Sequence, residues 1–263
     1  MTELAVNARG VGKIFPTKAG DVVALTEVEL TVEAGEFVSL IGPSGCGKST
    51  LLRLIADLDP ASSGTLEIFG KAASKARVDQ DYGIAFQQAG LLPWRTVAGN
   101  IALPLELHGM PRPARAVRVA ELAELVGLTE FVDRYPDQLS GGMQQRVAIA
   151  RALAEQPRLL LMDEPFGALD EMTREYLQGE LARIAADTGA AVVFVTHSIP
   201  EAVFLSDRVV VMSPRPGRIT DVITTALGDV RDEALRESPA YYERVTAVRE
   251  ALHGTSIERA NER

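Results

Sequence analysis

The sequence predicts an α/β fold in which a mostly parallel sheet carries an antiparallel N-terminal section and an inserted helical section. Residues 4–41 contain short alternating apolar stretches broken by turn residues, a pattern typical of a β-hairpin that leads into a buried strand. From Arg158 onward, apolar strand-like runs alternate with helical ones, which indicates parallel strands joined by helices. Between these parts, residues 90–154 are mainly helical in pattern and predict the insertion.

The first half of the chain predicts a strand, a loop and a helix in direct succession. The apolar run 37–41 ends at a glycine-rich stretch, and apolar residues at helical spacing follow from Lys48 to Leu58. Residues 65–70 and 82–86 resemble a second hairpin. In the inserted section, residues 114–126 predict a helix that Gly127 ends.

The second half predicts three further strands and the helices between them. Their expected ranges are 159–162, 191–195 and 208–212 for the strands, and 171–186 and 201–205 for the helices. The tail from residue 229 to 263 is mixed in charge, with a helix expected over 241–252.

Composition narrows the classes of function. The 263 residues include 27 Lys and Arg against 36 Asp and Glu, a net charge of −9, which argues against a broad basic face for nucleic acid. The single cysteine, Cys46, excludes an internal disulfide and suits a reducing compartment. No leader-like N-terminus and no apolar run of about 18–20 residues is present. We therefore expect a soluble, cytoplasmic protein that serves a membrane only through a partner.

The glycine-rich stretch matches the phosphate-binding loop G-x-x-x-x-G-K-[ST] and lies between a strand and a helix, as its mechanism requires. Glycines let backbone N–H groups turn toward phosphates, and the helix N-terminus adds its positive dipole end. Lys48 supplies a charge, and the Ser49 hydroxyl can ligate Mg²⁺. A glycine-rich turn without a ligand is the alternative. The loop comprises Gly42, Pro43, Ser44, Gly45, Cys46, Gly47, Lys48, Ser49 and Thr50.

Two carboxylates follow one of the apolar strand-like runs. Asp163 and Glu164 follow the run 159–162, and the carboxyl end of a buried parallel strand is where nucleotides bind in such sheets. Asp163 is therefore the expected Mg²⁺ ligand, and Glu164 the residue that polarises an attacking water. A strand followed by an acidic turn is the alternative.

A second helix N-terminus offers another anion site. Ser140 is a good N-cap, and Gly141 and Gly142 open a helix with exposed N–H groups. One nucleotide does not need two such sites on separate elements of one chain. We therefore expect this site to act on a nucleotide held by another copy.

These motifs, in this order, resemble the nucleotide-binding subunits of ATP-binding-cassette (ABC) transporters over residues 4–218, with LSGGMQQR at 139–146 as the signature motif. The resemblance implies a P-loop NTPase core of the RecA-like type, binding ATP and Mg²⁺ as a domain over residues 1–228, with a helical subdomain at about 90–154 and a tail at 229–263. It implies that Phe15 stacks on adenine, that Gln87 joins the metal and the attacking water, and that His197 is catalytic with Glu164. The signature motif and the D-loop at 168–170 would add further ATP contacts. These are Ser140, Gly141, Gly142, Gln144 and Asp170.

Finer features resemble the nitrate, sulfonate and taurine branch of bacterial importers, which includes carriers of pyrimidine precursors. They are the segments 91–94, 164–170 and 197–202. Asp57 departs from the family, which usually has glycine after the phosphate-loop helix.

The resemblance implies a set of partners. These are a second copy of the chain, permease subunits contacted near Gln87 and the helical subdomain, and indirectly a solute-binding protein, at the cytoplasmic face of a bacterial membrane and without nucleic acid. A soluble ABC ATPase of DNA repair or translation is the main alternative; the acidic charge and single cassette disfavour it. A P-loop kinase or GTPase has no reason to carry LSGGMQQR.

Overall fold

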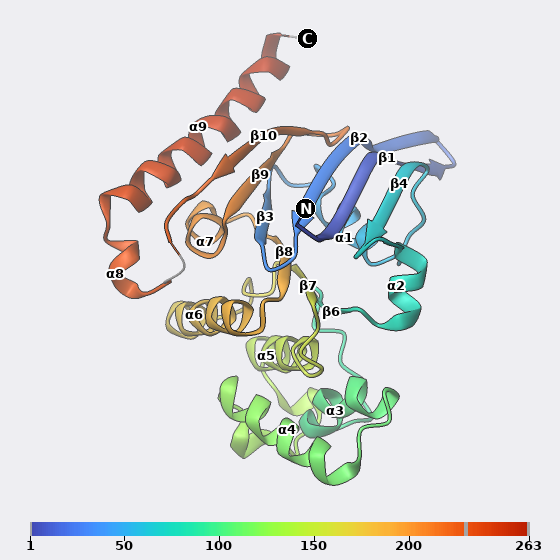
Figure 1. Cartoon of the computed structure of the whole chain (residues 1–263), viewed down its shortest axis with the longest axis vertical. Coiled ribbons are helices and arrows are strands. Elements are labelled where there is room, and N and C mark those ends of the chain that lie inside the picture. The colour runs from blue at the N-terminus through green and yellow to red at the C-terminus, as the bar shows by residue number, and fades with distance from the viewer. Residues whose placement is uncertain (1, 229–230, 262–263) are drawn as a thin grey trace.

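An antiparallel sheet of four strands occupies the N-terminal part of the computed structural model, which describes residues 2–228 and 231–261. The strand order is β2-β1-β4-β5 (Figure 1). A long hairpin joins the first two strands, and β4 pairs antiparallel with the other edge of β1. The antiparallel N-terminal section is therefore confirmed. The strands are β1 (Leu4–Thr17), β2 (Gly20–Glu33), β4 (Ser63–Ile68) and β5 (Lys71–Ala72).

A second, six-stranded sheet forms the centre of the molecule, in the order β10-β9-β3-β8-β7-β6. All its neighbours run parallel except β10, which pairs antiparallel with β9. The expected parallel α/β core is confirmed. The strands are β3 (Phe37–Ile41), β6 (Tyr82–Ala85), β7 (Leu159–Asp163), β8 (Ala191–Val195), β9 (Arg208–Met212) and β10 (Ile219–Thr224).

Both faces of the central sheet are buried, and the two-residue period of its strands divides the core. In β7, Leu159 and Leu161 belong to a cluster with α1 (Lys48–Ile55) and the antiparallel sheet. Leu160 and Met162 belong to a cluster with α6 (Glu171–Thr188) and α7 (Ile199–Leu205). Strands covered on both faces read as continuous apolar runs, which is why these strands are visible in the sequence.

The predicted hairpin between residues 65–70 and 82–86 is wrong. β4 instead turns back onto the short β5, α2 (Ala73–Asp79) follows, and β6 joins the central sheet parallel to β7. Gly83 explains the placement, because a Cβ there would lie 2.1 Å from the Ala152 carbonyl oxygen. The absence of a side chain lets the end of the signature helix approach β6, a long-range contact that local pattern does not encode.

The helical section lies below the sheets in Figure 1. The buried Asn100 fixes its entry, since its amide donates to the Leu92, Arg95 and Thr96 carbonyls and its oxygen accepts from the Leu92 N–H. The helices α3 (Val97–Leu107), α4 (Arg112–Leu125) and α5 (Gly141–Ala152), with 3₁₀ turns at Thr129–Phe131 and Pro136–Gln138, lie within the predicted range.

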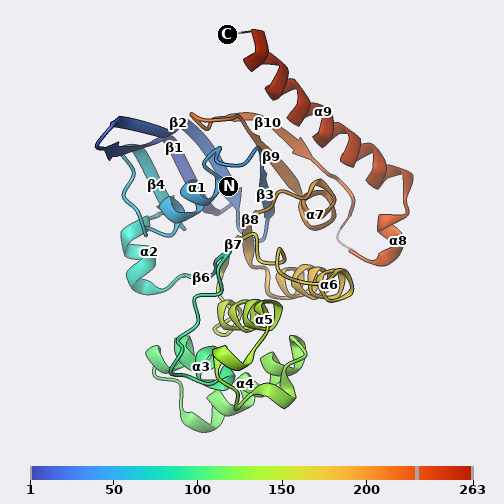
Figure 2. The same cartoon turned by 180° about the vertical axis from the view of Figure 1, so that it is seen from behind.

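The C-terminal part covers one face and one end of the central sheet. Figures 1 and 2 both show α9 running past β9 and β10, and its Tyr241, Val245 and Val248 are buried. The expected boundary at residue 229 falls on residues 229 and 230, which lie outside the described residues. The helices are α6 (Glu171–Thr188), α7 (Ile199–Leu205), α8 (Glu233–Arg236) and α9 (Pro239–Asn261). In the described ranges no helix has both the length and the hydropathy of a membrane span.

Asp57, which departs from the family pattern, is accommodated locally. Its φ of 49° is in the left-handed region that glycine adopts freely. Aspartate tolerates this region better than most residues, and Arg77 Nε donates to the Asp57 carboxylate at 3.0 Å. The local packing is therefore maintained without glycine.

Candidate active site

A cavity of about 550 Å³ lies where β3, β7 and β8 end. Ten of the nineteen predicted site residues line it, although they come from segments far apart in the chain. Three lining residues were not predicted: Val22, Ala24 and Arg215. The predicted residues on its wall are Phe15, Ser44, Gly45, Gly47, Lys48, Ser49, Thr50, Gln87, Glu164 and His197.

The loop after β3 has the conformation of a phosphate cradle. Gly45 and Gly47 have φ values of 75° and 107°, which L-residues with side chains rarely adopt. Helix α1 begins immediately afterward with no side chain capping its N-terminus. Its first N–H groups therefore suit an anion.

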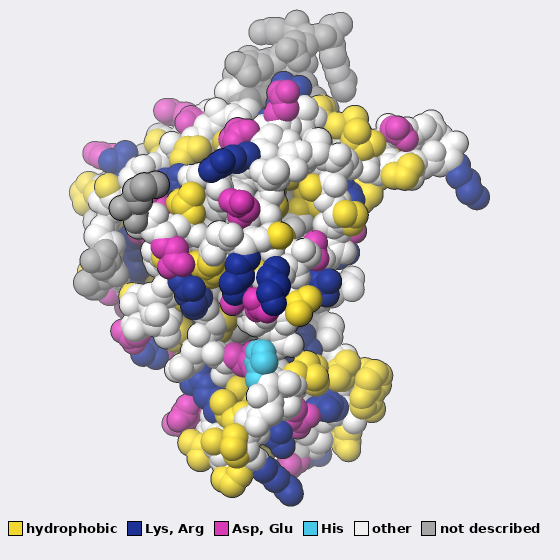
Figure 3. All heavy atoms as spheres, turned by 45° about the vertical axis from the view of Figure 1, so that its right-hand side comes forward, with side chains coloured by type: hydrophobic (Ala, Val, Ile, Leu, Met, Phe, Trp, Pro, Cys, Tyr) yellow, Lys and Arg dark blue, Asp and Glu magenta, His cyan; other side chains and the backbone are white. Residues whose placement is uncertain are grey.

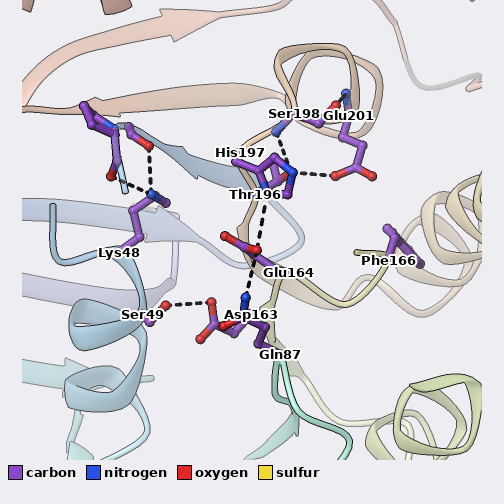
Figure 4. Close-up of polar contacts among 12 residues, drawn as sticks. Lys48, Ser49, Gln87, Asp163, Glu164, Phe166, Thr196, His197, Ser198 and Glu201 are labelled. Atoms are coloured by element: carbon purple, nitrogen blue, oxygen red, sulfur yellow. Dashed lines mark hydrogen bonds and ion pairs between the residues drawn. The ribbon is translucent and has the colours of Figure 1, made fainter. Parts of the chain in front are cut away.

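The Lys48 side chain folds back over this loop. Its ammonium donates to the Gly42 carbonyl at 2.8 Å and to the Pro43 carbonyl at 3.1 Å (Figure 4). Gly42, Pro43 and the buried Cys46 do not line the cavity. The Gly42 and Pro43 carbonyls, together with the Cys46 sulfur at 3.7 Å, hold the lysine charge beside the N-terminus of α1.

Ser49 and Asp163 meet beneath the cavity. The Ser49 hydroxyl donates to the Asp163 carboxylate at 2.9 Å. Burial raises the pKa of the Asp163 carboxyl, and the Ser49 hydrogen bond opposes that rise. These two oxygen donors fit Mg²⁺, which usually takes one or two protein ligands and completes its shell with phosphates and water. Within the described residues, no group of three acidic, His or Cys side chains could hold a metal.

Glu164 lies between two polar side chains that come from neighbouring strand ends. Its Oε2 accepts a hydrogen bond from Gln87 Nε2 at 3.1 Å and lies 3.3 Å from His197 Nδ1 (Figure 4). Its backbone has a φ of 47°, an uncommon conformation for a non-glycine residue. Its N–H donates to the Val195 carbonyl and ties the turn to β8. The structure thus places a carboxylate, an amide and an imidazole together at the cavity.

The signature and D-loop residues do not line this cavity. Ser140 caps α5 by accepting from the Met143 N–H at 3.2 Å, and the Gln144 amide donates to the Pro136 carbonyl at 2.8 Å. Asp170 caps α6, and the hydrogen bond from the Thr173 N–H lowers its pKa. Gly142 packs on the loop that precedes Asp170, because a Cβ on Gly142 would lie 3.0 Å from the Ala168 carbonyl oxygen, whereas a Cβ on Gly141 would have no heavy atom of the described residues within 4 Å.

Arg215 is the one charged lining residue that sequence reasoning missed. It belongs to the turn between β9 and β10, which packs on the phosphate loop so tightly that a Cβ on Gly217 would lie 2.0 Å from the Cys46 carbonyl. The Pro-Arg-Pro-Gly run at 214–217 marks a turn. It does not indicate which loop the turn contacts.

Known proteins match this chain over most of its length. The family model described as "ABC transporter" matches residues 25–167. The taurine import ATP-binding protein of Rhizobium johnstonii is 46% identical over 92% of this chain and 94% of its own, and the nitrate import ATP-binding protein of a Synechocystis strain is 41% identical over 94% and 95%. A dimeric ATP-binding cassette, solved in a post-hydrolysis state with ADP and phosphate, is 35% identical over 83% of this chain and 98% of its own, with a TM-score of 0.78. This chain belongs to the ABC transporter family, as an ATP-binding subunit that hydrolyses ATP.

Proposed function

We propose that the chain binds ATP in the 550 Å³ cavity and cleaves it with Glu164 as general base. The observation that carries this proposal is the position of the Glu164 carboxylate, beside the phosphate loop and within 3.3 Å of both Gln87 and His197. A general base must reach the proton it abstracts directly or through one water. A carboxylate at the edge of a phosphate cradle meets that requirement.

The other cavity residues bind and orient the nucleotide. The N–H groups of the phosphate loop and the N-terminus of α1 bind the phosphates, and Lys48 leaves its loop carbonyls to add a charge to them. Phe15 stacks on the adenine. Magnesium, held by Ser49, Asp163 and Gln87, would neutralise charge that develops on the phosphates.

Gln87 and His197 act on the reacting end of the nucleotide. Gln87 orients the water through its amide, and the His197 side chain, which is 69% exposed, contacts the γ-phosphate. Both side chains already contact Glu164, so water and phosphate enter a set of groups held near their working positions.

The complete site needs a second copy of the chain. Ser140, Gly141, Gly142, Gln144 and Asp170 lie outside the cavity of their own chain, whereas the N-terminus of α5 suits an anion. We propose a head-to-tail dimer in which these residues close on the nucleotide of the partner. The dimeric state of the matched cassette supports this arrangement.

The work of the ATPase is solute import through a separate permease. A hollow of about 220 Å³ between β6 and α3, lined in part by Tyr82, Leu103 and Leu107, supports a docking site for the permease. Leu107, which lines this hollow, and Trp94 on the same helical section are both exposed, and Figure 3 shows apolar side chains gathered on this lower part of the molecule. The chain would then function at the inner face of a bacterial membrane.

The named relatives import taurine and nitrate, which supports a small solute with an anionic oxygen group, of the nitrate, sulfonate or taurine type. A pyrimidine precursor such as an anionic ring compound is the second candidate within this branch. The selecting residues belong to the partner chains.

The test is an uptake assay in the native host. Deletion of the gene should abolish ATP-dependent uptake of one small anion, and the wild-type gene, but not a Glu164→Gln copy, should restore it. Purification of the tagged chain from membranes should recover the permease. Normal uptake of the tested anions in the deletion strain would refute the import role, and a purified wild type without ATPase activity would refute the catalytic one.

A further inference from the structure

A network of polar side chains with little exposure runs from Thr196, next to His197, to the C-terminal segment. Glu201, Thr196 and Gln178 form its centre, and their side chains are 12%, 1% and 2% exposed respectively. Buried polar groups cost free energy unless they are hydrogen-bonded. The hydrogen bonds of this network join Thr196 to Glu201 and Glu201 to Gln178.

Its inner end clamps the backbone on both sides of His197. The Thr196 hydroxyl donates to the Glu201 carboxylate at 2.5 Å and accepts from the Ser198 N–H at 2.9 Å (Figure 4). The residue before His197 is therefore bonded to the residue after it. Since the His197 side chain is 69% exposed and little packed, its position depends on this backbone.

Its outer end reaches the C-terminal segment through Gln178. Gln178 Nε2 donates to Glu201 Oε1 at 3.0 Å, and its Oε1 accepts from Arg236 Nη2 at 2.6 Å. Arginine only donates and a carboxylate only accepts, so the bridge between them needs a side chain that does both, as glutamine does. Arg236 is itself fixed over the Phe204 ring, 3.7 Å from its centre.

A branch of the same network reaches the D-loop. Arg174 pairs with Glu201 at 3.9 Å and donates to the Leu169 carbonyl at 2.8 Å. Leu169 immediately precedes Asp170, which lies at the proposed dimer interface. One carboxylate, Glu201, thus joins the loop that carries His197, the D-loop and α8.

We propose that Glu201, Thr196 and Gln178 are positioning residues for hydrolysis, and that Arg236 in α8 makes the C-terminal segment part of this device. The proposal rests on the proposed ATPase function and extends it. None of these residues lines the cavity. They act through His197 and the D-loop, so they affect the rate of the chemical step and not the affinity for ATP.

The experiment compares steady-state ATPase kinetics of five full-length variants with wild type. Thr196→Val keeps the shape but removes the hydroxyl, and Thr196→Ser returns the hydroxyl. Gln178→Met keeps the length of the side chain but removes its hydrogen bonds to Glu201 and Arg236. Arg236→Met removes the donor at the C-terminal end of the network. Arg183→Gln, on the exposed face of α6, is the matched control. Amide hydrogen exchange is followed in peptides spanning residues 196–201.

Thr196→Val and Gln178→Met should lower kcat about tenfold, with KM for ATP within about twofold of wild type, because a small displacement of a reacting group costs rate without removing binding contacts. Arg236→Met should give a smaller loss in the same direction. Thr196→Ser should recover kcat to within about twofold, and Arg183→Gln should match wild type. Exchange in 196–201 should accelerate in Thr196→Val and return to normal in Thr196→Ser.

Three results would overturn the proposal. These are an unchanged kcat in Thr196→Val and Gln178→Met, a Thr196→Ser variant as slow as Thr196→Val, or a loss that appears in KM with kcat preserved. A wild-type chain without ATPase activity would instead refute the proposed function, so the two failures are distinguishable. Folding is controlled by thermal unfolding midpoints, and a variant that unfolds early is replaced by Thr196→Ala with the same Ser comparison.

Discussion

At the scale of single residues, two charged groups of the site, Glu164 and Lys48, are held by contacts within their own chain. Glu164 has a left-handed backbone and a side chain placed between an amide and an imidazole. The Lys48 ammonium donates hydrogen bonds to the carbonyls of Gly42 and Pro43. Uncommon backbone conformations cost of order 1–3 kcal/mol and persist where function uses them. Both residues are therefore the first to test.

Glu164→Gln should bind ATP and lose about 10²–10⁴-fold in turnover, because glutamine keeps the length and a hydrogen-bonding oxygen but accepts no proton at neutral pH. Single-turnover ATP cleavage measures the loss. In the proposed dimer, ATP is held between the two copies, and separation of the copies requires loss of the γ-phosphate. The variant should therefore accumulate as an ATP-bound dimer on size-exclusion chromatography. Turnover within a few-fold of wild type would make this carboxylate structural.

Lys48→Ala should weaken ATP binding by about 2–3 kcal/mol or more, because the cradle loses its charge-assisted contact to the phosphates. Lys48 is buried and donates to the Gly42 and Pro43 carbonyls, so the thermal unfolding midpoint of the variant without nucleotide serves as the folding control. Equilibrium titration with a fluorescent ATP analogue gives the affinity. Near-normal affinity would exclude the lysine from the phosphate site.

At the scale of elements, β6 shows how a side-chain contact helps to hold a strand whose true partner the local pattern did not predict. The Tyr82 hydroxyl donates to the Ala56 carbonyl at the end of α1, at 2.6 Å. Burial raises the pKa of Tyr82 to about 12. This contact holds the strand that leads to Gln87 against the helix that carries Ser49.

Tyr82→Phe should lower the free energy of unfolding at pH 7 by about 1 kcal/mol through the lost hydrogen bond. The unfolded tyrosine loses its proton near pH 10, whereas the folded one keeps it until about pH 12. Wild type therefore loses stability as the pH rises through this range, and the variant lacks this loss. Urea denaturation of both proteins between pH 7 and 11.5 should show that their difference in free energy of unfolding becomes smaller above pH 10. A difference that does not change with pH would contradict the raised pKa of Tyr82.

At the scale of the whole molecule, the fold separates two anion-binding helix ends that one reaction needs together. The N-terminus of α1 lies in the cavity, whereas the N-terminus of α5, capped by Ser140, does not. The phosphate loop follows β3 and the signature helix belongs to the helical section below the sheets (Figure 1). Two chains in head-to-tail contact would each supply what the other lacks.

A mixture of Ser140→Arg and Lys48→Ala proteins tests this arrangement. Each homodimer should be inactive, because either the signature or the phosphate loop is damaged at both sites. In a mixed dimer, one site combines an intact phosphate loop with an intact signature and the other carries both lesions. We therefore expect partial recovery of ATPase activity on mixing. If mixed dimers form, as shown by differential tags, and no activity returns, then the two motifs do not act in trans as independent sites.

The sequence by itself determined the parts whose information is local. The phosphate loop between β3 and α1, the carboxylates after β7 and the capped start of α5 are each encoded by adjacent residues, and strands buried on both faces are visible as unbroken apolar runs. Tertiary structure decided what depends on contacts distant in the chain. β6 joined β7 because Gly83 admits the end of α5, and Arg215 reached the cavity because its turn packs on the loop at Cys46.

The hydrogen-bond network from Arg236 through Gln178 to Glu201 and Thr196 is the clearest feature that depends on contacts distant in the chain. A glutamine on a helix reads as an ordinary polar residue in sequence, and nothing adjacent to it marks a partner. Only the packing of α6 against α7 and α8 buries it between a donor and an acceptor 58 and 23 residues away. Local chemistry thus predicted the proposed nucleotide site, whereas the groups that we propose hold its catalytic residues in place depend on packing, because burial and long-range partners exist only in the folded chain.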